Sequence, residues 1–245
     1  MHRPIILWAM RRAPRPFGTD MGAKSSRSNG SYLSGTALVS RQQPPIAGII
    51  LAAGMSTRFG GNKLVAELDR VPIIRRVAET ALASGLQRIV AVLGHEHSAV
   101  RSALGDLPGD ERLEMVINEG YRQGQSSSVI AGLRALEADF SAAMYLMGDQ
   151  PRLSAGIIDG LIDAFQNSEK NICYPSFQNR RRNPVIFGER FYADILALTG
   201  DTGARAIIDA NPEDALAVAF EKEHPFLDVD EAGDLNLLHG AGKVC

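Results

Sequence analysis

Short runs of apolar residues alternate with longer amphipathic stretches from Ile46 onward. Runs rich in Ile, Val and Leu are typical of buried or half-buried strands. They predict strands at 46–52, 88–93, 114–118, 142–147 and 171–174. Apolar residues spaced three and four apart predict helices at 72–84, 96–104, 126–138 and 154–166. This alternation is typical of βαβ units, so we expect an α/β fold with three layers around a doubly wound, mostly parallel, Rossmann-like sheet.

The pattern becomes less regular after Tyr174. We expect helices at 189–198 and 203–209, a strand near 215–219 and a final helix from about 231. The chain has 245 residues, 45% of them hydrophobic, which is enough for one or two domains with real cores. Because we find no internal repeat, we assign residues 46–240 to a single domain.

Residues 1–45 differ in composition from the rest of the chain. They contain seven basic residues, one acidic residue and six serines, and they lack a periodic apolar pattern. We therefore expect a flexible basic extension. The Arg-rich and Ser-rich composition superficially suits a transit peptide, and a start at Met21 or a wrongly assigned start codon would explain it equally well.

Charge and cysteine content exclude several classes of function. The formal net charge of −2 gives no reason to expect a nucleic acid or a membrane surface as a partner. Cys173 and Cys245 are far apart, which excludes a disulfide framework or a zinc knuckle and favours a reducing cytoplasm. His95 and His97 lack a third metal ligand nearby. No apolar run approaches the roughly 18 residues that a membrane helix needs, so we expect a soluble, cytoplasmic protein.

The most informative segment is a glycine-rich turn after the first predicted strand, LAAGMSTRFGGNKL, at 51–64. Small residues at the carboxyl end of a parallel strand let backbone amides approach phosphate oxygens, and Arg58 and Lys63 add positive charge. The Walker A and GxGxxG patterns are both missing. The segment therefore predicts phosphate binding by another motif, and the alternative is a mobile glycine loop with surface charges.

Asp149 follows the very apolar strand predicted at 142–147. Ligands of open α/β sheets gather at this edge, beyond the carboxyl ends of the strands. Mg²⁺ takes oxygen ligands from one or two carboxylates and from substrate phosphates. The position therefore predicts a magnesium ligand, with a second acid from elsewhere in the chain, and the alternative role is a turn residue before Pro151.

The glycine-rich turn resembles the LAAGxSxRxGxxK signature of the nucleotidyltransferase superfamily, whose members transfer a nucleoside monophosphate from a nucleoside triphosphate. Five later segments resemble, in the same order, motifs of the molybdenum cofactor cytidylyltransferases within that superfamily. They are NEGYRQGQSSSVIAGL (118–133), YLMGDQP (145–151), NRRRNPVIFG (179–188), GDTGAR (200–205) and LDVDEAGDL (227–235). The resemblance spans about 46–238 and identifies 46–240 as a nucleotidyltransferase domain.

The resemblance implies an enzyme that transfers CMP from CTP to the terminal phosphate of molybdopterin, or molybdenum cofactor, and releases pyrophosphate. Because the acceptor phosphate is the nucleophile, catalysis needs positioning and charge neutralisation rather than a protein base. In this interpretation Lys63 holds the departing pyrophosphate, Arg58 holds the triphosphate, and Asp149 binds Mg²⁺. A transient contact with a recipient molybdoenzyme would follow.

The resemblance also implies a second metal ligand and a set of binding residues. It maps Asp230 onto the other metal ligand, with Asp228 as the alternative, and a helix N-cap as the alternative role of Asp230. The implied nucleotide-binding residues are Leu51, Ala52, Ala53, Gly54, Lys63, Asn118, Gln125, Ser126, Ser127 and Gly148, and the implied residues on the acceptor side are Asn183, Pro184, Asp201, Gly203 and Arg205. Helix capping and Asx turns explain several of these equally well. Of the three arginines at 180–182, we expect at most one to be functional.

Several alternative functions stay open. CTP is expected because Ala52 and Ala53 precede Gly54, where guanylyl-transferring relatives more often have a second glycine that leaves room for a larger base. One methyl group is worth only about 1–3 kcal/mol of discrimination, so a guanylyltransferase is the closest alternative, followed by a nucleotidyltransferase that acts on another small phosphate. A noncatalytic carrier that hands molybdenum cofactor to a molybdenum hydroxylase would need no Mg²⁺. A nicotinamide-dependent oxidoreductase is disfavoured because GxGxxG is missing.

Overall fold

The structure is a computed structural model that describes residues 45–136, 140–201 and 203–238. The expected basic extension therefore lies outside the described residues except at its last position, as do the last two residues of the expected domain. Within the described ranges, none of the helices has the length and apolar character needed to cross a membrane.

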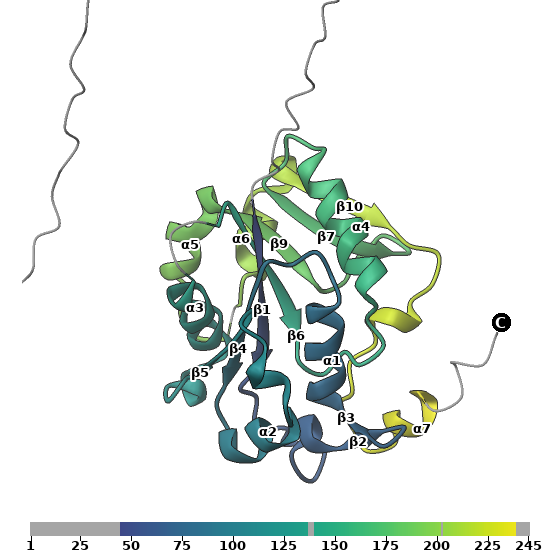
Figure 1. Ribbon diagram of the computed structural model, residues 1–245. Coiled ribbons are helices and arrows are strands. Elements are labelled where there is room, and N and C mark those ends of the chain that lie inside the picture. The colour runs from purple at the N-terminus through teal and green to yellow at the C-terminus, as the bar shows by residue number, and fades with distance from the viewer. Residues whose placement is uncertain (1–44, 137–139, 202, 239–245) are drawn as a thin grey trace, which may run out of the picture. The chain divides into compact units, whose positions relative to one another are not determined.

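A mostly parallel sheet forms the centre of the fold, in the strand order β10-β7-β9-β6-β1-β4-β5, with β8 paired to β7 (Figure 1). The strands are β1 (Ile46–Ala52), β4 (Arg88–Leu93), β5 (Leu113–Ile117), β6 (Ala142–Met147), β7 (Ile172–Phe177), β8 (Arg180–Arg181), β9 (Val185–Gly188) and β10 (Ala215–Ala219). Strands β5, β4, β1 and β6 are parallel, and so are β7 and β10. Strand β9 runs antiparallel to β6 and β7 and joins the two groups.

Helices cover both faces of this sheet, so the three-layer α/β architecture is confirmed (Figure 1). One face carries α1 (Ile73–Leu82), α2 (His97–Ala103) and α4 (Ala155–Gln166), and the other carries α3 (Gln125–Ala135), α5 (Tyr192–Leu196) and α6 (Arg205–Ala210). Successive strand residues point to opposite faces, so neighbouring apolar residues enter two different cores. In β1, Ile50 packs with the α1 and α4 side and Ile49 with the α3 side.

Smaller elements complete the fold. Strands β2 (Glu67–Leu68) and β3 (Val71–Pro72) form a hairpin, and α7 (Asp234–Leu238) is the last helix of the described part. Leu68, Ile73, Val229 and Leu238 form a third, small apolar cluster that packs the C-terminal segment against this hairpin. Short 3₁₀ helices lie at Lys63–Val65, Leu107–Gly109, Tyr121–Gln123, Glu189–Phe191, Pro212–Asp214 and His224–Phe226.

The apolar pattern predicted the parallel strands well and the antiparallel strand poorly. The strands expected at 46–52, 88–93, 142–147 and 215–219 have these bounds in the structure, and the strand expected at 114–118 begins and ends one residue earlier. The expected helix at 189–198 is a 3₁₀ turn followed by the short helix α5. Strand β9 was not predicted, because the three apolar residues and the glycine after NRRRNP carry neither a helical nor an alternating period.

Close contact between helix α3 and strands β1 and β4 depends on a glycine. A Cβ atom built on Gly132 would lie 2.3 Å from Ile49 Cγ2 and 3.0 Å from Val92 Cγ2. Both partners are buried β-branched side chains, which have few alternative rotamers. The glycine therefore sets how near the carboxyl-terminal half of α3 lies to the sheet.

We predict that Gly132→Ala destabilises the protein by about 1–3 kcal/mol, because the added methyl group overpacks this contact. Gly160→Ala is the matched control: it lies inside α4, nothing lies within 4 Å of its added Cβ, and removing a helical glycine should stabilise by about 0.5–1 kcal/mol. Urea denaturation of the two variants measures both effects. Equal stability of the two variants would contradict the close packing of α3.

Candidate functional site

Two cavities lie side by side at the carboxyl ends of β1 and β6, and Leu51, Gln125 and Met147 line both of them. The first, which we call the loop cavity, has a volume of about 390 Å³ and is lined mainly by the glycine-rich turn, by Lys63 and by Asp149. The second, which we call the arginine cavity, has a volume of about 470 Å³. Its lining includes Val129, Gln150, Arg181, Arg182, Asn183, Phe187, Arg205, Ile208 and Asp228.

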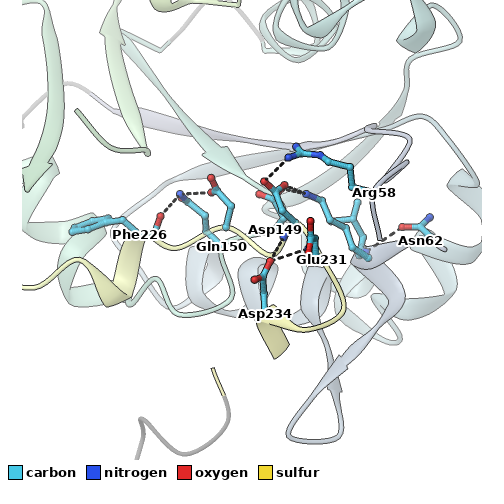
Figure 2. A network of polar contacts seen from close by, with 11 residues as sticks. Arg58, Asn62, Asp149, Gln150, Phe226, Glu231 and Asp234 are labelled. Carbon is cyan, nitrogen blue, oxygen red and sulfur yellow. Dashed lines mark hydrogen bonds and ion pairs between the residues drawn. The ribbon is translucent and has the colours of Figure 1, made fainter. Parts of the chain in front are cut away.

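A cluster of four charged side chains lies at the loop cavity (Figure 2). The Lys63 ammonium is 2.5 Å from Asp149 Oδ2 and 3.3 Å from Asp230 Oδ1. Arg58 Nη1 is 3.2 Å from Asp230 Oδ2 on the solvent side. Lys63 and Asp149 are mostly buried. Burial alone would lower the pKa of Lys63, but the two carboxylates raise it above its ordinary value, so the lysine stays charged.

Local structure directs Lys63 into this cluster. Asn62 caps the 3₁₀ helix Lys63–Val65, and its Oδ1 accepts a hydrogen bond of 3.1 Å from Leu64 N. Leu64 is buried in the core on the α1 side, so it fixes one side of the short helix. The preceding residue, Lys63, lines the loop cavity.

The two carboxylates have the chemistry of a divalent cation site. Asp149 Oδ1 is buried and has no hydrogen-bond partner among the described residues, while Oδ2 contacts Lys63. A buried carboxylate oxygen without a partner is costly, and hard cations prefer such oxygens as ligands. No group of three His, Cys, Asp or Glu side chains in the described ranges could hold a metal. The remaining ligands would therefore be phosphate oxygens or water, as is usual for Mg²⁺.

The expected position of Asp230 needs a correction at the level of local structure. We placed it near the start of a final helix from about 231, but α7 begins at Asp234, and 227–230 form an extended loop. Val229 N donates a 3.0 Å hydrogen bond to Asp149 O, and the Val229 side chain is fully buried. Asp234 Oδ2 accepts hydrogen bonds of 2.8 Å from the backbone N–H of Asp230 and Glu231 (Figure 2). Asp234 thus fixes the turn that precedes α7, and the Asp230 carboxylate contacts Lys63 and Arg58.

Asp228 lies two residues earlier but belongs to the other cavity. Its Oδ1 accepts a 2.8 Å hydrogen bond from Gln150 Nε2. Asp228 is exposed, yet partial loss of solvent around its carboxyl group and the nearby Asp149 carboxylate raise its pKa to about 6. Between the two acids that the resemblance left as alternatives, the structure places Asp230, and not Asp228, beside Lys63.

The GDTGAR segment binds the start of helix α3. Gln125 N donates to Asp201 Oδ1 at 3.2 Å, and Ser126 N donates to Gly200 O at 3.1 Å, so this loop caps α3 from outside. Gly124 has φ +106°, and a Cβ atom there would lie 2.5 Å from the Gly200 carbonyl. As a result Asp201 lines the loop cavity and Arg205 lines the arginine cavity.

Two of the expected nucleotide contacts are engaged within the protein. Asn118 Nδ2 donates to Ser127 Oγ at 2.9 Å and to Ser128 Oγ at 3.0 Å, and its Oδ1 accepts from Gly120 N. Ser127 Oγ donates to Gly124 O. The Asn118 and Ser127 side chains hold the start of α3, which matches the alternative roles in capping and Asx turns, and Ser126 is buried. Ser128, which we did not expect, lines the loop cavity; its spacing of three from Gln125 puts both on one helix face and was the available signal.

Of the other expected residues, some line a cavity and some pack in the core or against the backbone of the sheet. Leu51, Ala53 and Gly54 line the loop cavity, whereas Ala52 packs into the core. Gly148 is also part of the framework: a Cβ atom there would lie 2.8 Å from Leu51 O. Asn183 lines the arginine cavity and precedes the buried Pro184 across a cis peptide bond.

The arginine run divides between two environments. Arg180 is exposed, whereas Arg181 and Arg182 line the arginine cavity.

Further lining residues were not identified by the sequence analysis. Tyr121, Arg122 and Gln150 lie inside recognised motifs, but no role was assigned to them. Glu223 and Phe226 come from segments without a motif, so only the fold brings them to the site.

Comparison with known proteins places this site in a family. Residues 48–216 match the family model described as the MobA-like NTP transferase domain. The chain is 28% identical over 191 residues to the purine catabolism protein PucB of Bacillus subtilis (strain 168), covering 76% of this chain and 92% of PucB. It is 26% identical over 139 residues to a probable molybdenum cofactor guanylyltransferase of Thermococcus sibiricus (strain DSM 12597 / MM 739), covering 56% of this chain and 65% of that relative.

Solved structures share the fold. Rv0371c from Mycobacterium tuberculosis H37Rv superimposes with a TM-score of 0.70 at 23% identity, covering 80% of this chain and 98% of Rv0371c. A structure of Rv0371c in complex with manganese gives a TM-score of 0.66 at 21% identity, covering 79% of this chain and 97% of that one. Because the family model spans more than half of the sequence, and the site lies at the sheet edge that binds ligands in such folds, the chain belongs to the MobA-like NTP transferase domain family.

Proposed function

We propose that this nucleotidyltransferase transfers CMP from CTP to the phosphate of molybdopterin and releases pyrophosphate, and that residues 46–240 form its catalytic domain. The observation that carries the proposal is the shared wall of the two cavities. Leu51, Gln125 and Met147 line both cavities, and Lys63 and Asp149 lie in the loop cavity next to that wall. A nucleotide in the loop cavity and an acceptor in the arginine cavity would therefore meet beside the charged cluster.

The chemistry needs no protein nucleophile. An oxygen of the acceptor phosphate attacks the α-phosphorus of CTP, the bond from that phosphorus to the β-phosphate oxygen breaks, and pyrophosphate leaves with the electron pair. Negative charge grows on the leaving group, so fixed cations beside it lower the barrier. Lys63, held as an ammonium by two carboxylates, is placed to neutralise that charge, and Arg58 lies on the solvent side, where it can bind the triphosphate.

Asp149 and Asp230 are the residues that would hold Mg²⁺. When bound, the metal would neutralise phosphate charge and orient the triphosphate. The manganese complex of Rv0371c shows that a structural relative binds a divalent cation. Support in this chain comes from Asp149 Oδ1, a buried carboxylate oxygen without a partner among the described residues. Lys63 contacts both aspartates and Arg58 contacts Asp230, so two cations balance the two carboxylates.

Cytosine is favoured by one methyl group at the loop cavity. Ala53 is only 5% exposed and lines that cavity, and Ala52 faces the core on the other side of the strand end. The similarity to a probable molybdenum cofactor guanylyltransferase favours GTP as the second candidate substrate. After transfer, the product would pass to a recipient molybdoenzyme through a transient contact.

The direct test is pyrophosphate release by the purified protein with Mg²⁺ and molybdopterin, with CTP and GTP offered in separate reactions. The proposal expects faster release with CTP. Faster release with GTP would overturn the choice of base and keep the reaction. Cofactor binding without pyrophosphate release would instead indicate a carrier.

We predict that Asp149→Asn lowers kcat by roughly a thousandfold, because it removes the buried metal-binding carboxylate that is worth several kcal/mol. Asp230→Asn should mainly raise the Mg²⁺ concentration for half-maximal activity, because its carboxylate is more exposed. Pyrophosphate release at varied Mg²⁺ measures both effects. Asp106→Asn, an exposed site bound to Arg75, is the control. A near-normal rate in Asp149→Asn would show that the metal assignment is wrong.

We predict that Ala53→Gly shifts the ratio of kcat/KM for CTP and GTP toward GTP by about tenfold, because the larger base gains room. Ala52→Gly is the matched control, since its methyl group faces the core; it should reduce stability and leave the ratio unchanged. Steady-state kinetics with each nucleotide checks this. If both variants keep the native ratio, the methyl group of Ala53 does not select the base.

Because of Asp228, we expect the native protein to become less stable as the pH rises from about 4 to 6. We predict that Asp228→Asn abolishes this change. The pKa of Asp228 is about 6 in the folded protein and near its ordinary value of 3.8 in the unfolded chain. The folded state therefore binds the proton more tightly than the unfolded state does. The resulting contribution to the free energy of unfolding is fully present below pH 4 and is lost as the pH rises through 6. Urea denaturation between pH 4 and 8 should show that the free energy of unfolding of the variant rises relative to that of the native protein as the pH increases.

Asp106→Asn is the control of opposite sign for this experiment. Arg75 lowers the pKa of Asp106, so the stabilisation by this carboxylate is present at neutral pH and lost as the pH falls. The Asp106 variant should therefore be less stable than the native protein by a nearly constant amount between pH 4 and 8 and should recover only at lower pH. An identical pH profile in both variants would contradict the environment assigned to Asp228.

A further inference from the structure

The arginine cavity contains a buried amide group that is only half satisfied. Gln150 is 1% exposed, and its Nε2 donates to Phe226 O at 2.9 Å and to Asp228 Oδ1 at 2.8 Å (Figure 2). Both partners are acceptors, so the amide can be oriented in only one way. Its Oε1 is buried and has no partner in the described part of the chain.

The second unsatisfied group belongs to one of the three arginines. Both terminal nitrogens of Arg182 have partners, Glu223 and the Arg181 carbonyl. Arg181 Nη2 is 2.5 Å from Asp209 Oδ1, and its guanidinium lies 5.5 Å from the centre of the Tyr174 ring. These contacts hold the guanidinium in place, yet Arg181 Nη1 is buried without a partner among the described residues.

Three polar atoms on residues of this cavity lack partners among the described residues: Gln150 Oε1, Arg181 Nη1 and the Tyr145 hydroxyl. A buried donor or acceptor without a partner is costly, so a ligand that completes it is favoured. Gln150 Oε1 needs a hydrogen-bond donor, Arg181 Nη1 needs an acceptor, and the tyrosine hydroxyl pairs with either. The lining also includes the apolar side chains Val129, Phe187 and Ile208, which suit the face of a flat ring.

We propose that Gln150 and Arg181 select the acceptor by its ring: Gln150 Oε1 accepts a hydrogen bond from a ring-edge N–H of a pterin, and Arg181 Nη1 donates one to the ring carbonyl oxygen. This inference rests on the proposed function, in which the arginine cavity binds the acceptor. It adds that the ring, and not only the phosphate, is recognised there. Arg181 and Gln150 are therefore specificity-determining residues.

The test uses 6-hydroxymethylpterin phosphate, whose fluorescence reports binding, with the full-length protein. We expect Arg181→Met to raise its Kd about tenfold to a hundredfold, as for loss of one hydrogen bond from a charged donor. Arg181→Lys should restore part of the loss. Asp209, the partner left behind, is more than half exposed, so the variant should fold. Arg180→Met is the matched control, because Arg180 is exposed and lies outside the residues that line either cavity.

Gln150→Met provides a second variant, expected to weaken pterin binding by about tenfold. Since Gln150 also holds the Phe226 carbonyl, the fold of this variant and of the Arg181 variants is checked by circular dichroism and urea denaturation. Titration with inorganic phosphate separates the ring from the phosphate: its affinity should be the same in Arg181→Met and the native protein.

The outcomes distinguish this inference from the proposed function. If the native protein binds the pterin and Arg181→Met binds it as tightly as Arg180→Met does, the selection by Arg181 is wrong and the proposed reaction stands. If Arg181→Met weakens the binding of inorganic phosphate as much as it weakens the binding of the pterin phosphate, Arg181 binds the phosphate. The assignment of Arg181 to the ring is then overturned. If the native protein binds no pterin and releases pyrophosphate with another acceptor, both the proposed acceptor and this inference fail.

Discussion

One ammonium group between two carboxylates organises the site. Asp149 and Asp230 carry like charges into a partly buried space, which is costly unless a cation lies between them. Lys63 supplies that cation and in doing so connects three distant parts of the chain: the glycine-rich turn, the end of β6 and the C-terminal segment. The arrangement that balances the charge of the site without substrate is therefore the same one that would receive phosphates and a metal.

The position of this cluster follows from the sheet. The chain runs from β1 to β4 on one side and later places β6 on the other side of β1, so the loops beyond these two strands diverge. Such a point in an open α/β sheet leaves a crevice outside the strand ends. Here the crevice holds two adjoining cavities, and β9, antiparallel between β6 and β7, lies under the second one, where Val185 and Phe187 line the wall.

Backbone-to-backbone and backbone-to-side-chain bonds give the site its precision. The C-terminal loop is held by three sets of hydrogen bonds. Val229 N donates to Asp149 O, Gln150 donates to Asp228, and Asp234 accepts from the backbone N–H of Asp230 and Glu231. The GDTGAR loop is likewise fixed on the first turn of α3, where Gly124 allows a contact that a side chain would block. Asn118 and Ser127 act in the same framework. Several residues of the recognised motifs thus position the site, while their neighbours line it.

The sequence by itself determined the parallel strands, most of the helices and the glycine-rich turn, because these depend on local periodicity and on the small residues that follow a buried strand. It also indicated Lys63 by its place in that turn and Asp149 by its place after an apolar strand, whereas Asp230 was indicated only by the family resemblance. Only the tertiary structure decided that Asp228 faces a different cavity from Asp230, that Ser128 and not Ser126 lines the loop cavity, and which two arginines of the run enter the second cavity. These outcomes depend on hydrogen bonds and packing between segments far apart in the chain, such as Gln150 with Phe226 and Arg181 with Asp209. No local sequence pattern predicts these contacts, because the two residues of each contact lie far apart in the chain and only the fold brings them together.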